Sequence, residues 1–158
     1  MKTRRIVVLL ITHGLALAAG FAGGIYALPV LIAPPPPTEQ EVAAAASKAT
    51  SRGTFRRDLK DSDALHWGEG SVAIAADSVS LQGRLAPGPD YKLYLSPEFV
   101  ETEADFHRAK AGMVRLGDVK TFENFVVAVP PMVDVSSYSA VIVWCETFGQ
   151  FITAAKYK

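Results

Sequence analysis

Hydrophobic and polar residues alternate in short segments along the chain from residue 53 onward, with turn residues between the segments. In residues 91–96, Tyr91, Leu93 and Leu95 fall on one face of an extended chain, whereas the intervening residues fall on the other. The segments are 70–77, 78–83, 91–96, 113–119, 122–129, 138–146 and 150–157. A period of two is typical of β-strands. It predicts an all-β domain, an antiparallel β-sandwich or flattened barrel of about seven or eight strands.

Residues 98–111 depart from this alternation and are predicted to contain one short helix. Thr102 is placed to cap the helix, and Asp105 near its start suits the helix dipole. Lys110 near its end suits the opposite pole of the dipole, and Gly112 is a common stop signal.

The first part of the chain has a different pattern, because no charged residue occurs from Ile6 to Ala33. We expect a continuous helix over Ile6–Leu28, limited by Pro29. At about 1.5 Å per residue it reaches roughly 35 Å, enough for a hydrocarbon core of about 30 Å. Residues 1–33 are thus predicted to be a basic tip and a signal-anchor transmembrane helix, a single membrane span. The alternative is a cleaved signal peptide and a secreted domain.

Basic residues before this span indicate its orientation. Lys2, Arg4 and Arg5 precede it, and the positive-inside bias keeps such residues in the cytoplasm. The C-terminal domain is then extracytoplasmic, or periplasmic if the cell is bacterial. Gly20 and Gly24 have the GxxxG spacing, a weak signal for helix dimerisation in the membrane.

Residues 34–52 are rich in proline and alanine and are predicted to form a stalk between the membrane and a β domain at 53–158. Residues 34–37 are all proline, which favours a stiff extended segment. Thr38 and Glu41 have the spacing of a capping box, so a short helix is expected after them.

Composition excludes several classes of function. The chain has 16 basic and 16 acidic residues, and no basic patch interleaved with aromatic residues indicates nucleic-acid binding. Its single cysteine excludes an intrachain disulfide and a zinc site built on a cysteine pair, and we predict no metal site. No conventional catalytic motif is present, so the sequence favours a protein that is not an enzyme.

The single cysteine, Cys145, ends a predicted strand with two apolar faces. Val141 and Val143 share its face, and Trp144 lies on the other. A strand apolar on both faces is expected to be central and covered on both sides. Buried free cysteine usually acts as a small hydrophobe. Its neighbour Glu146 is an anion, whereas a reactive thiolate favours a nearby cation, so ligation is the better chemistry for Cys145 if it is functional.

Several segments together resemble a known family. They are "GTFRRD" (53–58), "GSVAI" (70–74), "PGPDYKLYLS" (87–96), "LGDVK" (116–120) and "SYSAVIVWCETFGQFITAA" (137–155). Their order and motifs are similar to the DM-thirteen domain, a family labelled as an electron-transfer domain. The resemblance implies that Cys145, in the W-C motif, is a redox thiol or the ligand of a prosthetic group such as haem. We take Trp144 and His66 as further candidate cofactor contacts.

Two functional hypotheses follow. The first is a membrane-tethered, extracytoplasmic DM-thirteen-like redox module that uses Cys145, with an unidentified protein partner. The second is a non-catalytic binding or adhesion β-sandwich in which this cysteine is structural.

Overall fold

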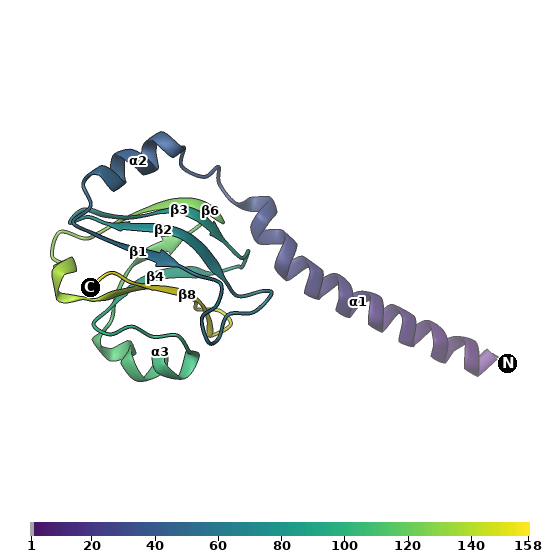
Figure 1. The fold of residues 1–158 in the computed structure, drawn as a ribbon. Helices are drawn as coiled ribbons and strands as arrows, with labels where there is room; N and C mark the ends of the chain where they lie inside the picture. The colour runs from purple at the N-terminus through teal and green to yellow at the C-terminus, as the bar shows by residue number, and fades with distance from the viewer. Residues whose placement is uncertain (1) are drawn as a thin grey trace.

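The alternating segments form the strands of two antiparallel sheets in the computed structural model, which describes residues 2–158 (Figure 1). One four-stranded sheet has the order β1-β2-β3-β6 and the other the order β5-β4-β7-β8. The predicted antiparallel sandwich is therefore confirmed. The strands are β1 (Ser51–Phe55), β2 (Gly68–Ile74), β3 (Ser78–Leu85), β4 (Tyr91–Ser96), β5 (Val114–Val119), β6 (Glu123–Ala128), β7 (Ala140–Cys145) and β8 (Gln150–Lys156).

Apolar side chains from the facing sides of the two sheets form the main core. Val72 and Ile74 of β2 are buried there with Leu93 and Leu95 of β4, and Cys145 of β7 belongs to the same cluster. These residues are two apart within each strand, so the period-two pattern directs them to one side. Burying each such side chain contributes about 1.5–3 kcal/mol.

A second core covers the outer face of the sheet that contains β7. It lies under helix α3 (Glu103–Ala109) and the 3-10 turn η1 (Lys110–Gly112). Phe106 of α3 stacks on Trp144 of β7, with ring centroids 3.8 Å apart and an interplanar angle of 5°. Thr102 caps α3 by accepting a hydrogen bond from the backbone N–H of Asp105, as predicted. All six residues of β7 are buried, which confirms that it is central and covered on both faces.

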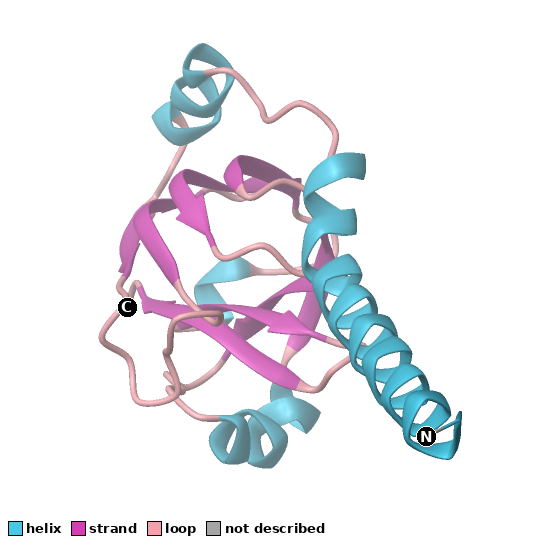
Figure 2. Cartoon of the chain, turned by 90° about the vertical axis from the view of Figure 1, so that its right-hand side faces the viewer, coloured by secondary structure: helices cyan, strands magenta, loops and turns pink. Residues whose placement is uncertain are grey.

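Two helices precede the sandwich. Helix α1 spans Lys2–Ile32, and α2 spans Glu39–Ser47 with the predicted capping box between Thr38 and Glu41. A short 3-10 turn, η2, covers Val135–Ser137. Figure 2 shows α2 and α3 on opposite sides of the paired sheets, so the molecule has four layers.

The prediction that Pro29 limits the first helix to Ile6–Leu28 is wrong, because α1 continues through Pro29 to Ile32. A proline removes its own N–H as a donor and crowds the carbonyl four residues earlier, a local cost that packing can offset. Pro29 is buried, and it faces a cavity shared with Asp90 and Lys92 of the sandwich.

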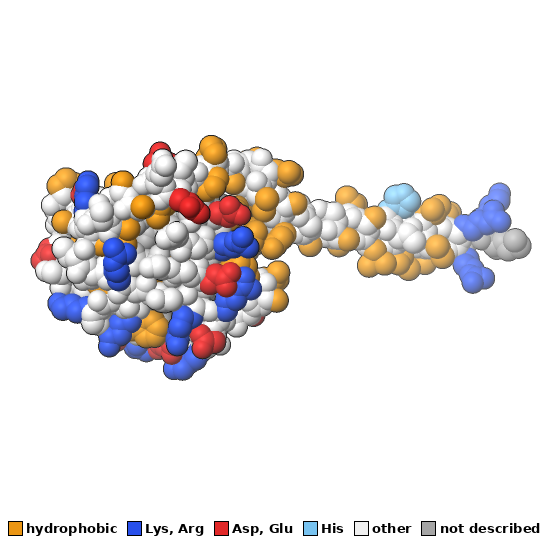
Figure 3. Space-filling view, turned by 45° about the horizontal axis from the view of Figure 1, so that its top comes forward, with side chains coloured by type: hydrophobic (Ala, Val, Ile, Leu, Met, Phe, Trp, Pro, Cys, Tyr) orange, Lys and Arg blue, Asp and Glu red, His pale blue; other side chains and the backbone are white. Residues whose placement is uncertain are grey.

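Helix α1 projects away from the sandwich, and most of its side chains between the tip and the sandwich are apolar (Figure 3). Its most apolar 18-residue window has a mean hydropathy of 2.1, and none of that window is buried. By length and composition the helix can cross a membrane, and a signal sequence has the same properties. Basic side chains gather at its N-terminal tip.

Candidate functional site

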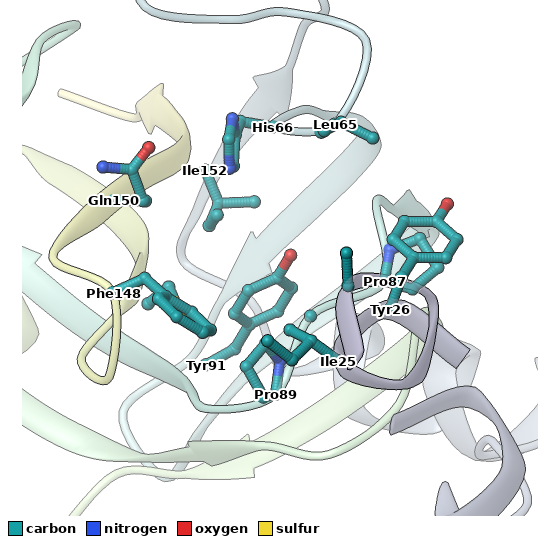
Figure 4. A pocket seen from close by; sticks show the side chains of 13 residues that line it. Ile25, Tyr26, Leu65, His66, Pro87, Pro89, Tyr91, Phe148, Gln150 and Ile152 are labelled. Atoms are coloured by element: carbon teal, nitrogen blue, oxygen red, sulfur yellow. The ribbon is translucent and has the colours of Figure 1, made fainter. Parts of the chain in front are cut away.

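A pocket of about 430 Å³ lies where the C-terminal part of α1 meets the end of the sandwich (Figure 4). Its walls come from α1, the β1–β2 loop, the β3–β4 loop and the β7–β8 turn. Ligand pockets in proteins typically have about 300–1,000 Å³, so this volume suits a small molecule or part of a larger one. The lining residues are Ala22, Ile25, Tyr26, Leu65, His66, Pro87, Gly88, Pro89, Tyr91, Cys145, Phe148, Gln150 and Ile152.

Cys145 lies in one wall of this pocket, at the end of β7. It pairs with Tyr91 of β4 on one side and with Gln150 of β8 on the other. The residue is 2% exposed, and its thiol is free. Burial raises the pKa of the Cys145 thiol, and hydrogen bonds from the backbone of Phe148, Asp90 and Thr147 act in the opposite direction. The thiol is therefore neutral near pH 7, while nearby backbone groups are placed to support a bound thiolate.

His66 reaches the same pocket from the β1–β2 loop, where Asp63 fixes its position. One carboxylate oxygen of Asp63 accepts hydrogen bonds from the backbone N–H groups of Leu65 and His66, each at 2.7 Å. The other oxygen lies 3.0 Å from Nδ1 of His66, and this contact lowers the pKa of Asp63. Since Nδ1 is occupied, Nε2 is the ring nitrogen left for a ligand.

Tyr91 is a third polar group in the pocket, and the sequence pattern placed it only on one face of a predicted strand. It is 3% exposed, and its hydroxyl points into the pocket (Figure 4). The hydroxyl is not among the buried polar atoms that lack a partner within residues 2–158, so it is open to the pocket and available to a ligand. Burial raises the pKa of Tyr91, so the hydroxyl remains a donor at neutral pH.

Gly88 gives the Tyr91 ring its space. A Cβ atom added at Gly88 would overlap the ring of Tyr91, so any other residue at this position requires the ring to move. The turn "PGPD" directly before Tyr91 is the sequence signal that was available for this arrangement.

Trp144 lies on the other side of the sheet. Its ring is in the core under α3, and it does not line the pocket. Its Nε1–H is buried and has no hydrogen-bond partner within residues 2–158. The structure thus brings two of the predicted site residues, Cys145 and His66, to one pocket and leaves Trp144 apart from them.

Helix α1 supplies a wall that sequence reasoning missed, because it treated the span and the domain as separate units. Ala22, Ile25 and Tyr26 face the pocket from this helix. The available signal was Tyr26, which is the only tyrosine in the apolar run and lies near its end. Tyrosine is enriched at membrane interfaces, where one end of its side chain stays polar.

Comparison with known proteins identifies the domain. A search of curated proteins and a search of solved structures found no match. A family model described as Electron transfer DM13 matches residues 58–157, which is more than half of the chain and includes every strand from β2 to β8. The resemblance found in the sequence motifs is confirmed, and the chain belongs to the electron-transfer DM13 family.

Proposed function

We propose that this protein is a membrane-tethered electron-transfer module whose redox group occupies the pocket at Cys145. The observation that carries the proposal is that Cys145 and His66, two residues with ligand-type side chains, line one pocket in a DM13 domain. A mostly apolar pocket in which a few polar groups converge is the default candidate for a binding or active site.

The chemistry of Cys145 favours holding a redox group over attacking a substrate. Its pKa is raised, and no Lys or Arg lines the pocket to stabilise a free thiolate. A thiolate and an imidazole are the donors that proteins use for haem iron, which supplies one-electron transfer when bound. The donor atoms fit haem, but its two carboxylates find no cationic partner among the lining residues. The proposal therefore rests on Cys145 and His66 and not on haem in particular.

The setting we propose is the outer surface of a membrane. Helix α1 is long enough to span the bilayer, and Lys2, Arg4 and Arg5 at its tip favour the cytoplasmic side for the N-terminus. The sandwich is then extracytoplasmic, and the prolines at 34–37 and α2 lead from the span into the domain.

The proposal is tested by a reduced-minus-oxidised ultraviolet–visible difference spectrum of the full chain purified from membranes in mild detergent. We expect a redox-dependent band that is lost or strongly weakened in Cys145→Ser and His66→Ala. Trp144→Phe is the matched control, since it changes the neighbouring residue on the opposite face and should keep the band. A wild-type protein with no redox-dependent band, or a band unchanged in Cys145→Ser, would favour the binding-module hypothesis with a structural cysteine.

A further inference from the structure

The length of α1 relates the pocket to the membrane surface. The helix has 31 residues, so at about 1.5 Å per residue it reaches roughly 46 Å. A hydrocarbon core of about 30 Å is crossed by about twenty residues, and counting from Ile6 the outer boundary falls close to Ile25. Ile25 and its neighbours Ala22 and Tyr26 are the residues of α1 that form the pocket wall. The pocket therefore lies at the level where the hydrocarbon meets the headgroups.

The rim of the pocket is apolar and exposed on the side of α1. Leu65 is 55% exposed, Phe148 is 49% exposed and Tyr26 is 46% exposed, and these three residues come from three different elements. Large apolar side chains gathered around one opening are unfavourable in water and favourable at a bilayer surface. The opening thus suits a ligand that arrives from the membrane.

The interior of the pocket selects against charged ligands. None of its lining residues is Lys, Arg, Asp or Glu, so the phosphate of a phospholipid would find no cationic partner. The polar groups that point inward are the Tyr91 hydroxyl and the His66 imidazole (Figure 4). The rings of Tyr91 and Phe148 add flat apolar surface. These features describe a neutral, flat ligand that accepts a hydrogen bond from the Tyr91 hydroxyl and donates one to Nε2 of His66.

We propose that the pocket binds the ring of a membrane quinone that enters from the outer leaflet. This assignment rests on the proposed function and names its redox group as a quinone held without a covalent bond, with Cys145 forming part of the wall around it. The Tyr91 hydroxyl donates to a quinone carbonyl oxygen. Because Nδ1–H of His66 donates to Asp63, Nε2 of His66 is an acceptor, and it accepts from a hydroxyl of the ring in its reduced, quinol form. The isoprenoid tail leaves along the exposed side chains of Leu65 and Tyr26 toward the bilayer.

Cys145 allows a direct test, because it is the only thiol in the chain and lies in the pocket wall. The full chain is reconstituted in phosphatidylcholine liposomes with or without decylubiquinone, and the alkylation rate of Cys145 by N-ethylmaleimide is measured by mass spectrometry. The ubiquinone ring is fully substituted, so it does not form an adduct with the thiol. At a decylubiquinone concentration that occupies about nine-tenths of the sites, we expect alkylation to slow about tenfold.

Substitutions in the pocket wall test which residues contact the quinone. Ile25→Trp fills the pocket from α1 and should abolish the effect of decylubiquinone on the alkylation rate. Leu28→Trp is the matched control, since Leu28 is exposed on the same helix and does not line the pocket, and it should keep the effect. Tyr91→Phe removes one donor and should weaken quinone affinity about fivefold, the usual effect of one neutral hydrogen bond.

Equal alkylation rates with and without decylubiquinone would overturn the quinone assignment. The assignment would also be overturned if Cys145 reacted more slowly in phosphatidylcholine liposomes without decylubiquinone than it does in detergent. A purified protein that already carries haem would overturn it as well. In each of these cases a Cys145-dependent redox spectrum would still leave the proposed electron-transfer function standing. Protection by decylubiquinone without any Cys145-dependent redox band would instead keep the binding site and refute the electron-transfer function.

Discussion

Replacing Phe106 by alanine tests whether the two faces of β7 have separate roles. Phe106 is fully buried, stacks on Trp144 at 3.8 Å and meets Tyr94 edge-on at 5.4 Å. A buried Phe→Ala change usually costs about 3–5 kcal/mol. Aromatic pairs add about 0.5–1.5 kcal/mol beyond burial, so we expect a loss of about 4–5 kcal/mol. A domain of this size has a free energy of unfolding of about 5–15 kcal/mol, so the variant is weakened and still able to fold.

The loss is measured by urea unfolding of the full chain in mild detergent, followed by tryptophan fluorescence. With a denaturant dependence of about 2 kcal/mol per molar, the midpoint should fall by about 2 M. Met132→Ala is the control, because Met132 is 91% exposed and its truncation should change stability by less than about 0.5 kcal/mol. The reduced-minus-oxidised spectrum should be unchanged in both variants. A loss below about 1 kcal/mol for Phe106→Ala, or a lost redox band in a variant that is still folded, would refute this division between the faces.

Three further predictions concern the pocket and the charges around it. Gly88→Ala should displace the Tyr91 ring and alter the Cys145 alkylation rate with little change in fold, as checked by circular dichroism. The alkylation rate of native Cys145 should keep rising with pH beyond the ordinary thiol pKa of about 8.5, because burial raises its pKa. Hydrogen bonds from Tyr94 and then Lys110 lower the pKa of Glu146. The resulting stability is present above the unfolded pKa and lost as pH falls through the folded value, so Glu146→Gln should show a smaller loss of unfolding free energy below about pH 4.5.

Alternation of apolar residues is sufficient to predict β2 to β8, because each of these strands directs alternate apolar residues toward a core. In β5 only Val119 is buried, but Val114 and Leu116 pack against the core from the same face. Alternation does not reveal β1, in which only Phe55 is buried and the other residues are partly or fully exposed. Predicting a central β7 succeeds for the same physical reason, since both of its faces are apolar. The extent of α1 is harder to predict, because its continuation through Pro29 depends on packing against a distant part of the chain.

The candidate site is predictable only in part. The family motif identifies Cys145, but the pocket walls come from residues near 25, 65, 88 and 148, which only the fold brings together. The pairing of Cys145 with Tyr91 depends on the strand register, and the participation of α1 depends on how the helix packs against the sandwich. Trp144 was predicted to contact the cofactor because it is next to Cys145 in the sequence. Neighbouring residues in a strand face opposite sides of the sheet, so this adjacency does not place both side chains in one pocket.

The most direct test of the central claim is the alkylation rate of Cys145 in the native wild-type chain and in native Phe106→Ala. If the thiol reacts through the pocket, destabilising the opposite face should change this rate by less than about threefold. If the thiol is sealed in the core, it reacts only after global unfolding, and a loss of about 4 kcal/mol should then accelerate alkylation on the order of 1000-fold. We predict the first result. The second would contradict the assignment of the Cys145 pocket as the redox site.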